Sequence, residues 1–127
     1  MNLDQRIEVV EFPQQENTYS VIQIDVGDQS YLVFGNSNRE LHPEVLEKFL
    51  ETKRLRVVKD RQRLGQWIEE NIPLWKTDQY TVRGMGQAKV EKGGVTFSGK
   101  SGWYEIGVKS TLLPKSYQGV NFYCDSN

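Results

Sequence analysis

The chain contains very little of the residue types that build most metal and catalytic sites, because it has one cysteine, Cys124, and one histidine, His42. A single cysteine excludes an internal disulfide framework and any metal site made of several thiolates. A zinc site would have too few nitrogen and sulfur ligands. We therefore expect no metal and no cofactor, and we interpret Cys124 as a buried, inert thiol in a final strand.

The sequence also lacks long apolar runs. No stretch is long enough to span a bilayer, and the first residues lack the basic start and the apolar stretch of a secretory signal. We therefore expect a cytoplasmic protein without membrane contact. Of the 127 residues, 37% are hydrophobic and 26% are charged, which is typical of a globular chain near the commonest domain size. We predict a single domain over residues 1–127.

Neither sign of charge dominates the chain, whose formal net charge is −1, but the two signs are separated along it. Residues 1–50 hold nine acids and three bases, whereas residues 51–63 hold six bases and two acids. Opposite patches of this kind steer the association of a protein with its partner and set its orientation. The separation therefore favours a binding function.

The two ends of the chain have the alternating pattern of β-strands, with turn residues between them. In the first third we predict an antiparallel meander of three strands, over residues 6–12, 19–26 and 29–34. In the last third we predict a hairpin and two further strands, over residues 88–91, 95–97, 103–109 and 120–124. The edges of the three-stranded meander would need cover.

The middle of the chain has the spacing of helices. A first helix is predicted to begin at Pro43, which suits the first helical turn, and to pack an apolar face on the sheet. A second helix is predicted over residues 61–71, because Asp60 offers an N-cap and apolar residues recur at helical spacing. The resulting order, β-β-β-α-α-β-β-β, predicts an α+β fold in which antiparallel sheet surrounds two central helices.

One stretch formally matches the phosphate-binding pattern G-x-x-x-x-G-K-[ST], with Gly94, Gly99, Lys100 and Ser101 at the defining positions. That motif binds phosphate because the loop leaves a strand and opens a helix. The residues after Ser101 are strand-like and form a poor helix, so the required context is missing. We interpret the match as two hairpin turns and Lys100 as a solvated turn residue.

The basic segment, residues 53–63, is the strongest local feature of the sequence. Its six bases suit the phosphates of a nucleic acid, and two tryptophans downstream of the first bases suit stacking on nucleobases. The chain as a whole is not basic, with a sequence pI near 5.9, which argues against nucleic acid as the first choice. The candidate binding residues are Lys53, Arg54, Arg56, Lys59, Arg61, Arg63, Trp67 and Trp75.

Catalysis by a Ser-His-Asp or Cys-His relay would have to use His42. This residue stands directly before Pro43, where a loop or capping role accounts for it. No pair of carboxylates demands a catalytic role, so we favour a protein that is not an enzyme. The alternative is an active site without a local motif, assembled from residues far apart in sequence.

The glycines of residues 83–87, together with Trp103 and Tyr104, suit the wall of a small-molecule pocket, which is a third hypothesis. The function that the sequence favours is an accessory or regulatory domain that binds another protein. Nucleic-acid binding through residues 53–63 is the alternative, and self-association stays open.

Overall fold

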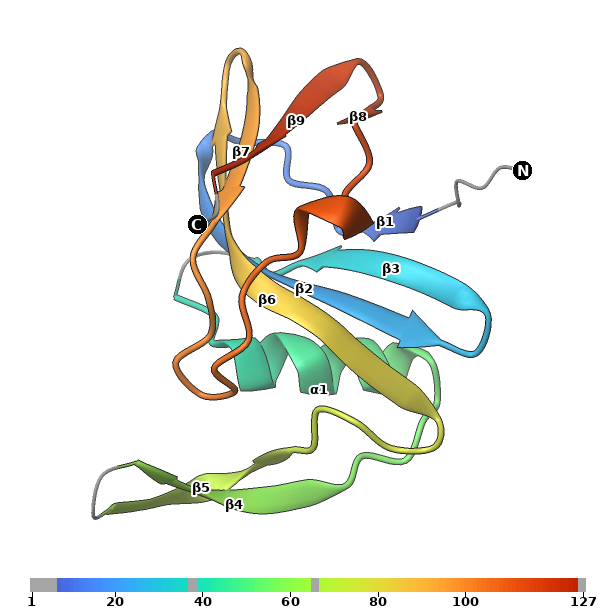
Figure 1. The fold of residues 1–127 in the computed structure, drawn as a ribbon, viewed down its shortest axis with the longest axis vertical. Helices are drawn as coiled ribbons and strands as arrows, with labels where there is room; N and C mark the ends of the chain where they lie inside the picture. Colours follow the sequence, from blue (N-terminus) through green and yellow to red (C-terminus); the bar gives the residue numbers. More distant parts are fainter. Residues whose placement is uncertain (1–6, 37–38, 65–66, 126–127) are drawn as a thin grey trace.

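The computed structural model describes residues 7–36, 39–64 and 67–125, with side chains described outside residues 61–70. Within these residues the elements are β1 Ile7–Val10, β2 Asn17–Val26, β3 Gln29–Phe34, α1 His42–Thr52, β4 Lys59–Leu64, β5 Trp67–Pro73, β6 Tyr80–Glu91, β7 Gly94–Ser98, the 3-10 helix Ser110–Leu112, β8 Ser116–Tyr117 and β9 Val120–Cys124. Seven strands form a nearly closed, barrel-like sheet in the order β1-β3-β2-β6-β7-β9-β8 (Figure 1). Strands β4 and β5 form a separate two-stranded sheet.

The predicted α+β fold with two central helices is wrong, because the described residues are mostly β and contain one α-helix. The predicted second helix, residues 61–71, falls instead on the two strands of the separate sheet. Its apolar spacing is compatible with a helix, but a short apolar pattern does not distinguish helix from strand. Gly65 lies in the middle of the stretch and disfavours a helix by about 1 kcal/mol relative to alanine.

Two details of the strand prediction are also wrong. Strand β1 pairs in parallel with β3 and not as part of an antiparallel meander, although β2 and β3 form the expected antiparallel pair. The predicted strand over residues 103–109 is instead the end of a turn, residues 102–104, followed by irregular chain with one isolated bridge between Lys100 and Gly107. The predicted strand over residues 120–124 is confirmed as β9.

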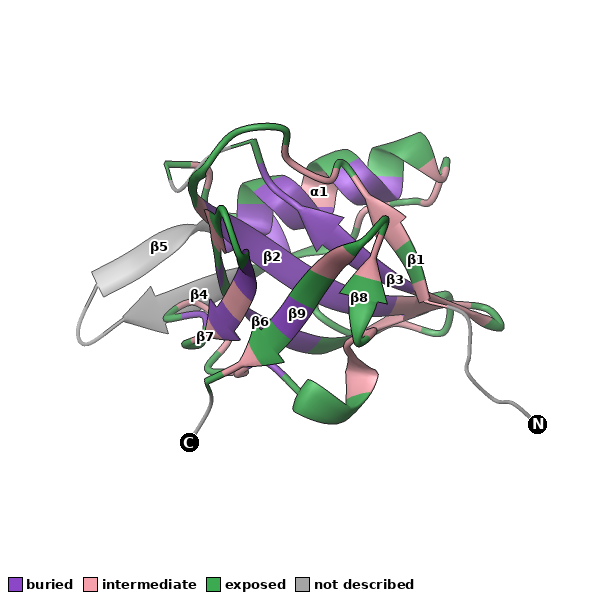
Figure 2. Cartoon of the chain, turned by 90° about the horizontal axis from the view of Figure 1, so that it is seen from above, coloured by how far each residue is buried: buried purple, intermediate pink, exposed green. Residues whose placement is uncertain are grey.

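Strand β2 lies inside the sheet between β3 and β6, and its residues 19–24 are buried (Figure 2). Side chains alternate along a strand, so Ile22 and Ile24 face α1 while Val21 faces the inside of the curled sheet. We call the buried residues on the α1 side the helix-side cluster: Ile22, Ile24, Tyr31, Val33, Val45, Leu46, Phe49, Leu50, Tyr80, Val82 and Met85. We call those inside the curled sheet the inner cluster: Tyr19, Val21, Leu32, Phe34, Ala88, Val95, Phe97, Val108 and Phe122. Burial on both faces explains why β2 carries apolar or aromatic residues on both of its sides, with Tyr19 and Val21 on one side and Ile22 and Ile24 on the other.

Aromatic contacts bring the two ends of the curled sheet together. The ring centroid of Phe12, which follows β1, lies 5.1 Å from that of Tyr117 in β8 and 6.1 Å from that of Phe122 in β9. Phe122 in turn lies 5.0 Å from Phe97 in the inner cluster. Side-chain packing therefore closes the barrel between its first and last strands.

Helix α1 begins as the sequence predicts, with Pro43 in its first turn. The Leu41 N–H donates to Glu44 Oε1 at 2.8 Å, which satisfies one of the free N–H groups at the helix start. The apolar face that packs on the sheet consists of Val45, Leu46, Phe49 and Leu50. In the described part of the chain, no helix is long and apolar enough to span a bilayer.

The C-terminus of α1 ends in a Schellman motif. The Leu55 N–H donates to the Leu50 carbonyl at 3.0 Å, and the Arg54 N–H donates to the Glu51 carbonyl at 3.0 Å. Leu50 and Leu55 also belong to the same apolar cluster, as is usual for this motif. Arg54 occupies the left-handed position with a φ of 56°, where glycine is the favoured residue.

Candidate binding surfaces

The basic segment runs from the end of α1 through an extended link into β4. Along this link, Leu55 and Val57 are half-buried against the helix-side cluster, while Arg54 and Arg56 are exposed. Leu55 and Val57 therefore contribute to the core, whereas Val58 is 42% exposed. Arg54 and Arg56 are the predicted site residues of this link, and both face solvent.

Two other cations of the segment already have partners in the folded chain. The Lys53 ammonium lies 4.4 Å from the ring centroid of Tyr31 and 5.7 Å from that of Phe49, which is a cation–π arrangement. Lys59 Nζ forms an ion pair with Glu47 Oε2 at 3.0 Å. These contacts place Lys53 and Lys59 against the body of the protein.

The remaining predicted residues lie in or beyond the two-stranded sheet. Arg61 and Arg63 fall in β4 and Trp67 in β5, but their side chains lie outside the described set. Their role in binding stays a prediction. Trp75 follows β5, and its side chain is 44% exposed.

Strands β4 and β5 form an arm that projects from the body of the protein (Figure 1). Among the described strands, β4 and β5 pair only with each other, so each has one backbone edge without a strand partner. The other strands belong to the curled sheet, whose ends are brought together by aromatic packing. The outer strands of that sheet, β1 and β8, also lack a partner on one edge, but they are shorter than β4 and β5, so the arm carries the longest unpaired strand edges among the described strands.

Two tyrosines fasten the root of the arm to the body. The Tyr104 hydroxyl donates to the Pro73 carbonyl at 2.6 Å, and the Tyr80 hydroxyl donates to the adjacent Leu74 carbonyl at 2.6 Å. Burial raises the pKa of both hydroxyls above the ordinary tyrosine value, and the neighbouring Tyr80 adds to the shift at Tyr104. Both groups therefore stay protonated and able to donate at neutral pH.

The root of the arm also carries a small surface pocket. Its volume is about 170 Å³, and it is lined by Asp60, Ile72, Pro73, Leu74, Trp75 and Tyr104. Val58, just before β4, is 42% exposed, and its carbonyl accepts a hydrogen bond at 2.7 Å from the N–H of Leu74, the residue before Trp75. We call the exposed residues Val58 and Trp75, together with this pocket, the root patch.

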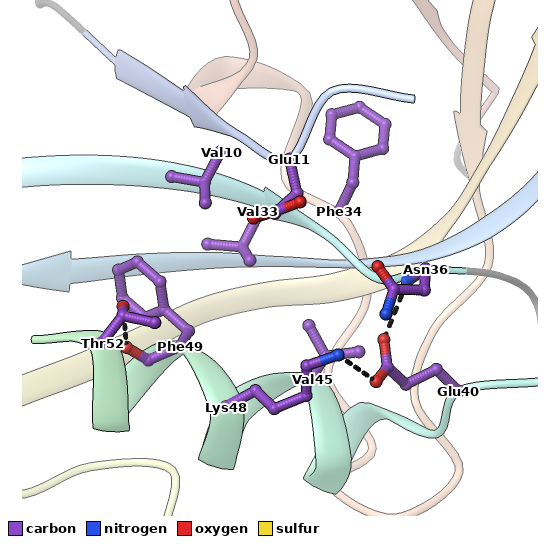
Figure 3. Close-up of a pocket in the computed structure, with 10 residues that line it drawn as sticks. All are labelled: Val10, Glu11, Val33, Phe34, Asn36, Glu40, Val45, Lys48, Phe49 and Thr52. Atoms are coloured by element: carbon purple, nitrogen blue, oxygen red, sulfur yellow. Dashed lines mark hydrogen bonds and ion pairs between the residues drawn. The ribbon is translucent and has the colours of Figure 1, made fainter. Parts of the chain in front are cut away.

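A second pocket, of about 240 Å³, lies between α1, β3 and the edge strand β1 (Figure 3). Apolar side chains form its floor, and polar side chains stand at its rim. The floor residues are Val10, Val33, Val45 and Phe49, and the rim residues are Glu11, Asn36, Glu40, Lys48 and Thr52. Phe34 also lines the pocket, but its ring packs in the inner cluster. We call this cavity the α1 pocket.

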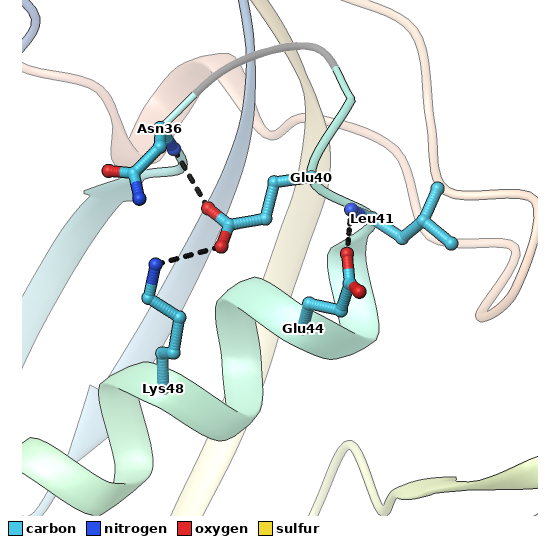
Figure 4. Close-up of polar contacts among 5 residues, drawn as sticks. All are labelled: Asn36, Glu40, Leu41, Glu44 and Lys48. Atoms are coloured by element: carbon cyan, nitrogen blue, oxygen red, sulfur yellow. Dashed lines mark hydrogen bonds and ion pairs between the residues drawn. The ribbon is translucent and has the colours of Figure 1, made fainter.

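Glu40 organises the rim of the α1 pocket (Figure 4). Its carboxylate accepts hydrogen bonds from the Asn36 N–H and from Lys48 Nζ, both at 2.8 Å. Burial raises the pKa of Glu40, but these two hydrogen bonds and the Lys48 charge outweigh burial, so the pKa lies below its usual value. Glu40 is therefore a fixed negative charge at neutral pH, with a side chain that is 15% exposed.

His42 anchors α1 to the sheet. Its ring is buried, and Nε2–H donates to the Gly86 carbonyl of β6 at 2.8 Å. Burial lowers the pKa of His42, and the hydrogen bond to Gly86 opposes that shift only in part. The ring is therefore neutral at neutral pH. Its buried position and its hydrogen bond show that His42 packs the start of the helix against the sheet. Sequence reasoning placed it at the helix start but missed this contact, which is distant in sequence.

The residues that match the phosphate-loop pattern do not lead into a helix, so they lack the helix N-terminus whose N–H groups bind phosphate in that motif. Gly94 is in β7, and the residues after Gly99 form turns. The buried Ser101 hydroxyl accepts hydrogen bonds from the N–H groups of Trp103 and Tyr104 at 3.1 and 3.2 Å, so it holds a turn.

The glycines predicted to line a small-molecule pocket instead allow tight packing within β6. A Cβ atom on Gly84 would overlap Gln23 Oε1, and a Cβ on Gly86 would overlap the Val108 side chain. Tyr104, the aromatic residue predicted to join them, fastens the arm. Small-molecule binding by this set stays a prediction.

Among the described residues, no group of three or more histidine, cysteine, aspartate or glutamate side chains has the arrangement of a metal site. In comparisons with known proteins, the chain matches no family model, and no curated protein or solved structure matches it significantly.

Proposed function

We propose that this protein is a non-catalytic binding domain whose partner is another protein, and that the arm and the root patch form the contact. The observation that carries the proposal is the arm itself, whose two strands pair only with each other among the described strands. An isolated two-stranded hairpin is marginally stable in water. A partner that adds a strand or a surface to the arm would complete it.

The backbone and side chains at the arm suit two recognised modes of protein binding. A free strand edge can accept an extended segment of a partner by main-chain hydrogen bonding. Exposed tryptophan is enriched among the residues that contribute most to interfaces, and Trp75 lies beside the root pocket. The two tyrosine hydrogen bonds at the root would hold these groups in place before binding.

Nucleic-acid binding is a second candidate, and the exposure of Arg54 and Arg56 on one link favours it. The surroundings oppose it, because Lys59 is paired with Glu47 and the solvent side of α1 carries Glu44 and Glu51. A fluorescence titration with labelled single- and double-stranded DNA and RNA over a salt series decides between the candidates. Affinity that falls steeply with salt and is lost in the double variant Arg54→Glu/Arg56→Glu would favour nucleic acid.

The proposal is tested by affinity capture from the native source, with the bound proteins quantified by mass spectrometry. The test variants are Trp75→Ala and Val58→Ser, and the control is Tyr123→Ala, which removes an aromatic side chain 52% exposed on β9. We expect a partner retained by wild type and by the control and lost from the test variants. If the wild type, the control and both test variants captured the same proteins, the proposed role of the root patch would be wrong. The predicted cytoplasmic location stays a prediction.

A further inference from the structure

The α1 pocket has the size and lining of a socket for one apolar side chain. Its floor includes Val33, Val45 and Phe49, which are buried members of the helix-side cluster. Its volume of about 240 Å³ is below the roughly 300–1,000 Å³ of sites that enclose drug-sized ligands. A single large aliphatic or aromatic side chain matches it better than a whole cofactor does.

The pocket adjoins a shallow, open groove of about 530 Å³ over the solvent side of α1. The two share Asn36, Glu40 and Lys48, so the rim of the pocket is also the start of the groove. The charged residues of the pocket and groove are Glu11, Glu40, Glu44, Glu47 and Glu51, opposed by Arg39 and Lys48. An apolar socket therefore opens onto a surface where acidic side chains outnumber basic ones.

The internal ion pairs leave that surface negative. Lys48 is bonded to Glu40, and Lys59, outside the groove, pairs with Glu47. Glu44 Oε1 is used by the Leu41 N–H, which keeps its charge at the helix start. Glu11 and Glu51 add two further exposed acidic side chains, one at the pocket rim and one near the end of α1. A polyanion such as a nucleic acid would be repelled here, whereas a cationic chain would be attracted.

We propose that the α1 pocket and its groove form a docking site for a basic segment of a partner protein. One large apolar side chain of that segment occupies the pocket, and its flanking lysine or arginine residues lie along the acidic side of α1. Burial of the apolar anchor supplies affinity, and the charges set the direction of the segment. This site is distinct from the arm and stands whether or not the arm binds a partner.

The test is a selection of random dodecapeptides displayed on phage against the full-length wild-type chain, with counter-selection on Thr52→Trp. Thr52 is an exposed residue at the pocket rim, so a tryptophan there fills the socket without entering the core. The matched control is Thr111→Trp, at an exposed threonine of the 3-10 helix that does not line the pocket. A synthetic peptide of the enriched sequence is then titrated by fluorescence anisotropy.

We expect the enriched peptides to share one large apolar residue flanked by lysine or arginine. The synthetic peptide should bind wild type and Thr111→Trp alike and bind Thr52→Trp roughly tenfold more weakly. Glu51→Lys should weaken binding several-fold, whereas Glu91→Lys, an equal charge change at the end of β6, should not. Trp75→Ala should leave binding unchanged, so failure of this site and failure of the arm are distinguishable.

Three results would overturn the proposal. The first is that no enriched peptide depends on the pocket. The second is that the enriched peptides are acidic or uncharged, or that Glu51→Lys and Glu91→Lys change the affinity equally. The third comes from sedimentation velocity: a dimer of the wild-type chain that Thr52→Trp dissociates would show that a second copy occupies the pocket.

Discussion

The Tyr104 hydroxyl donates a hydrogen bond to the Pro73 carbonyl at 2.6 Å, across a separation of 31 residues. This contact joins the turns after β7 to the last residue of β5. The Tyr80 hydroxyl makes the same kind of bond to the next carbonyl, that of Leu74. The hydroxyl groups of two tyrosines, one buried and one half-buried, therefore hold the root of the arm against the body.

Removal of the Tyr104 hydroxyl should loosen the root. We predict that Tyr104→Phe lowers the free energy of unfolding by about 1 kcal/mol, because it leaves a carbonyl without its donor and keeps the ring. Urea denaturation measures the loss. Tyr123→Phe, at an exposed ring of β9, is the control and should change stability little. Equal effects of the two substitutions would contradict the role of Tyr104.

The neutral, buried His42 makes stability depend on pH in a definite direction. Its folded-state pKa is lowered, so below the ordinary value of about 6.5 the unfolded chain binds more protons and is favoured. We predict that wild type loses more stability than His42→Gln between about pH 7.5 and about pH 5.5. Thermal or urea unfolding at both pH values checks the difference. Parallel losses in the two chains would contradict a lowered His42 pKa.

Arg54 occupies a position at the end of α1 that favours glycine. We predict that Arg54→Gly raises the free energy of unfolding by about 1 kcal/mol, because its φ of 56° is costly for a residue with a Cβ atom. Arg56→Gly removes an equal charge from the extended link and should give no such gain. Urea denaturation compares the two. A loss of stability in Arg54→Gly would show that its side chain makes a larger contribution than the backbone strain.

Gly84 must remain without a side chain for Gln23 to hold its partner. The Gln23 amide bonds both the N–H and the carbonyl of Lys109 at 2.9 Å, and a Cβ on Gly84 would overlap its Oε1. We predict that Gly84→Ala costs about 1–3 kcal/mol through this overpacking. Gly93→Ala, where a Cβ meets open space, is the matched control for urea denaturation. A Gly84→Ala chain as stable as the control would contradict the contact.

Elements with a strong local pattern could be predicted from the sequence. Strand β3 and helix α1 were predicted because alternation, or helical spacing after Pro43, coincides with turn residues at their ends. The arm was not predicted, because the spacing of Leu64, Trp67 and Ile68 in the sequence fits a helix as well as a hairpin. Only Gly65 opposes the helix locally, and tertiary context decides such cases.

The binding surfaces were less predictable than the strands. The exposed Arg54 and Arg56 follow from the alternation of basic and apolar residues along the link. The α1 pocket does not, because it combines residues from β1, the loop after β3, and α1 that no short motif connects. The two tyrosine hydrogen bonds at the root were not predictable either. The bond from Tyr104 to Pro73 joins segments that are distant in sequence, and the bond from Tyr80 to Leu74 depends on a turn that the sequence pattern did not indicate.

The most direct test of the proposed function is hydrogen–deuterium exchange of the whole chain, alone and with the partner captured by the wild type. We predict slower exchange on binding at the backbone amides of β4 and β5 and around Trp75, because the partner covers the arm and the root patch. Exchange in β4 and β5 that is the same with and without the partner would contradict the central claim, whichever other part of the chain became protected.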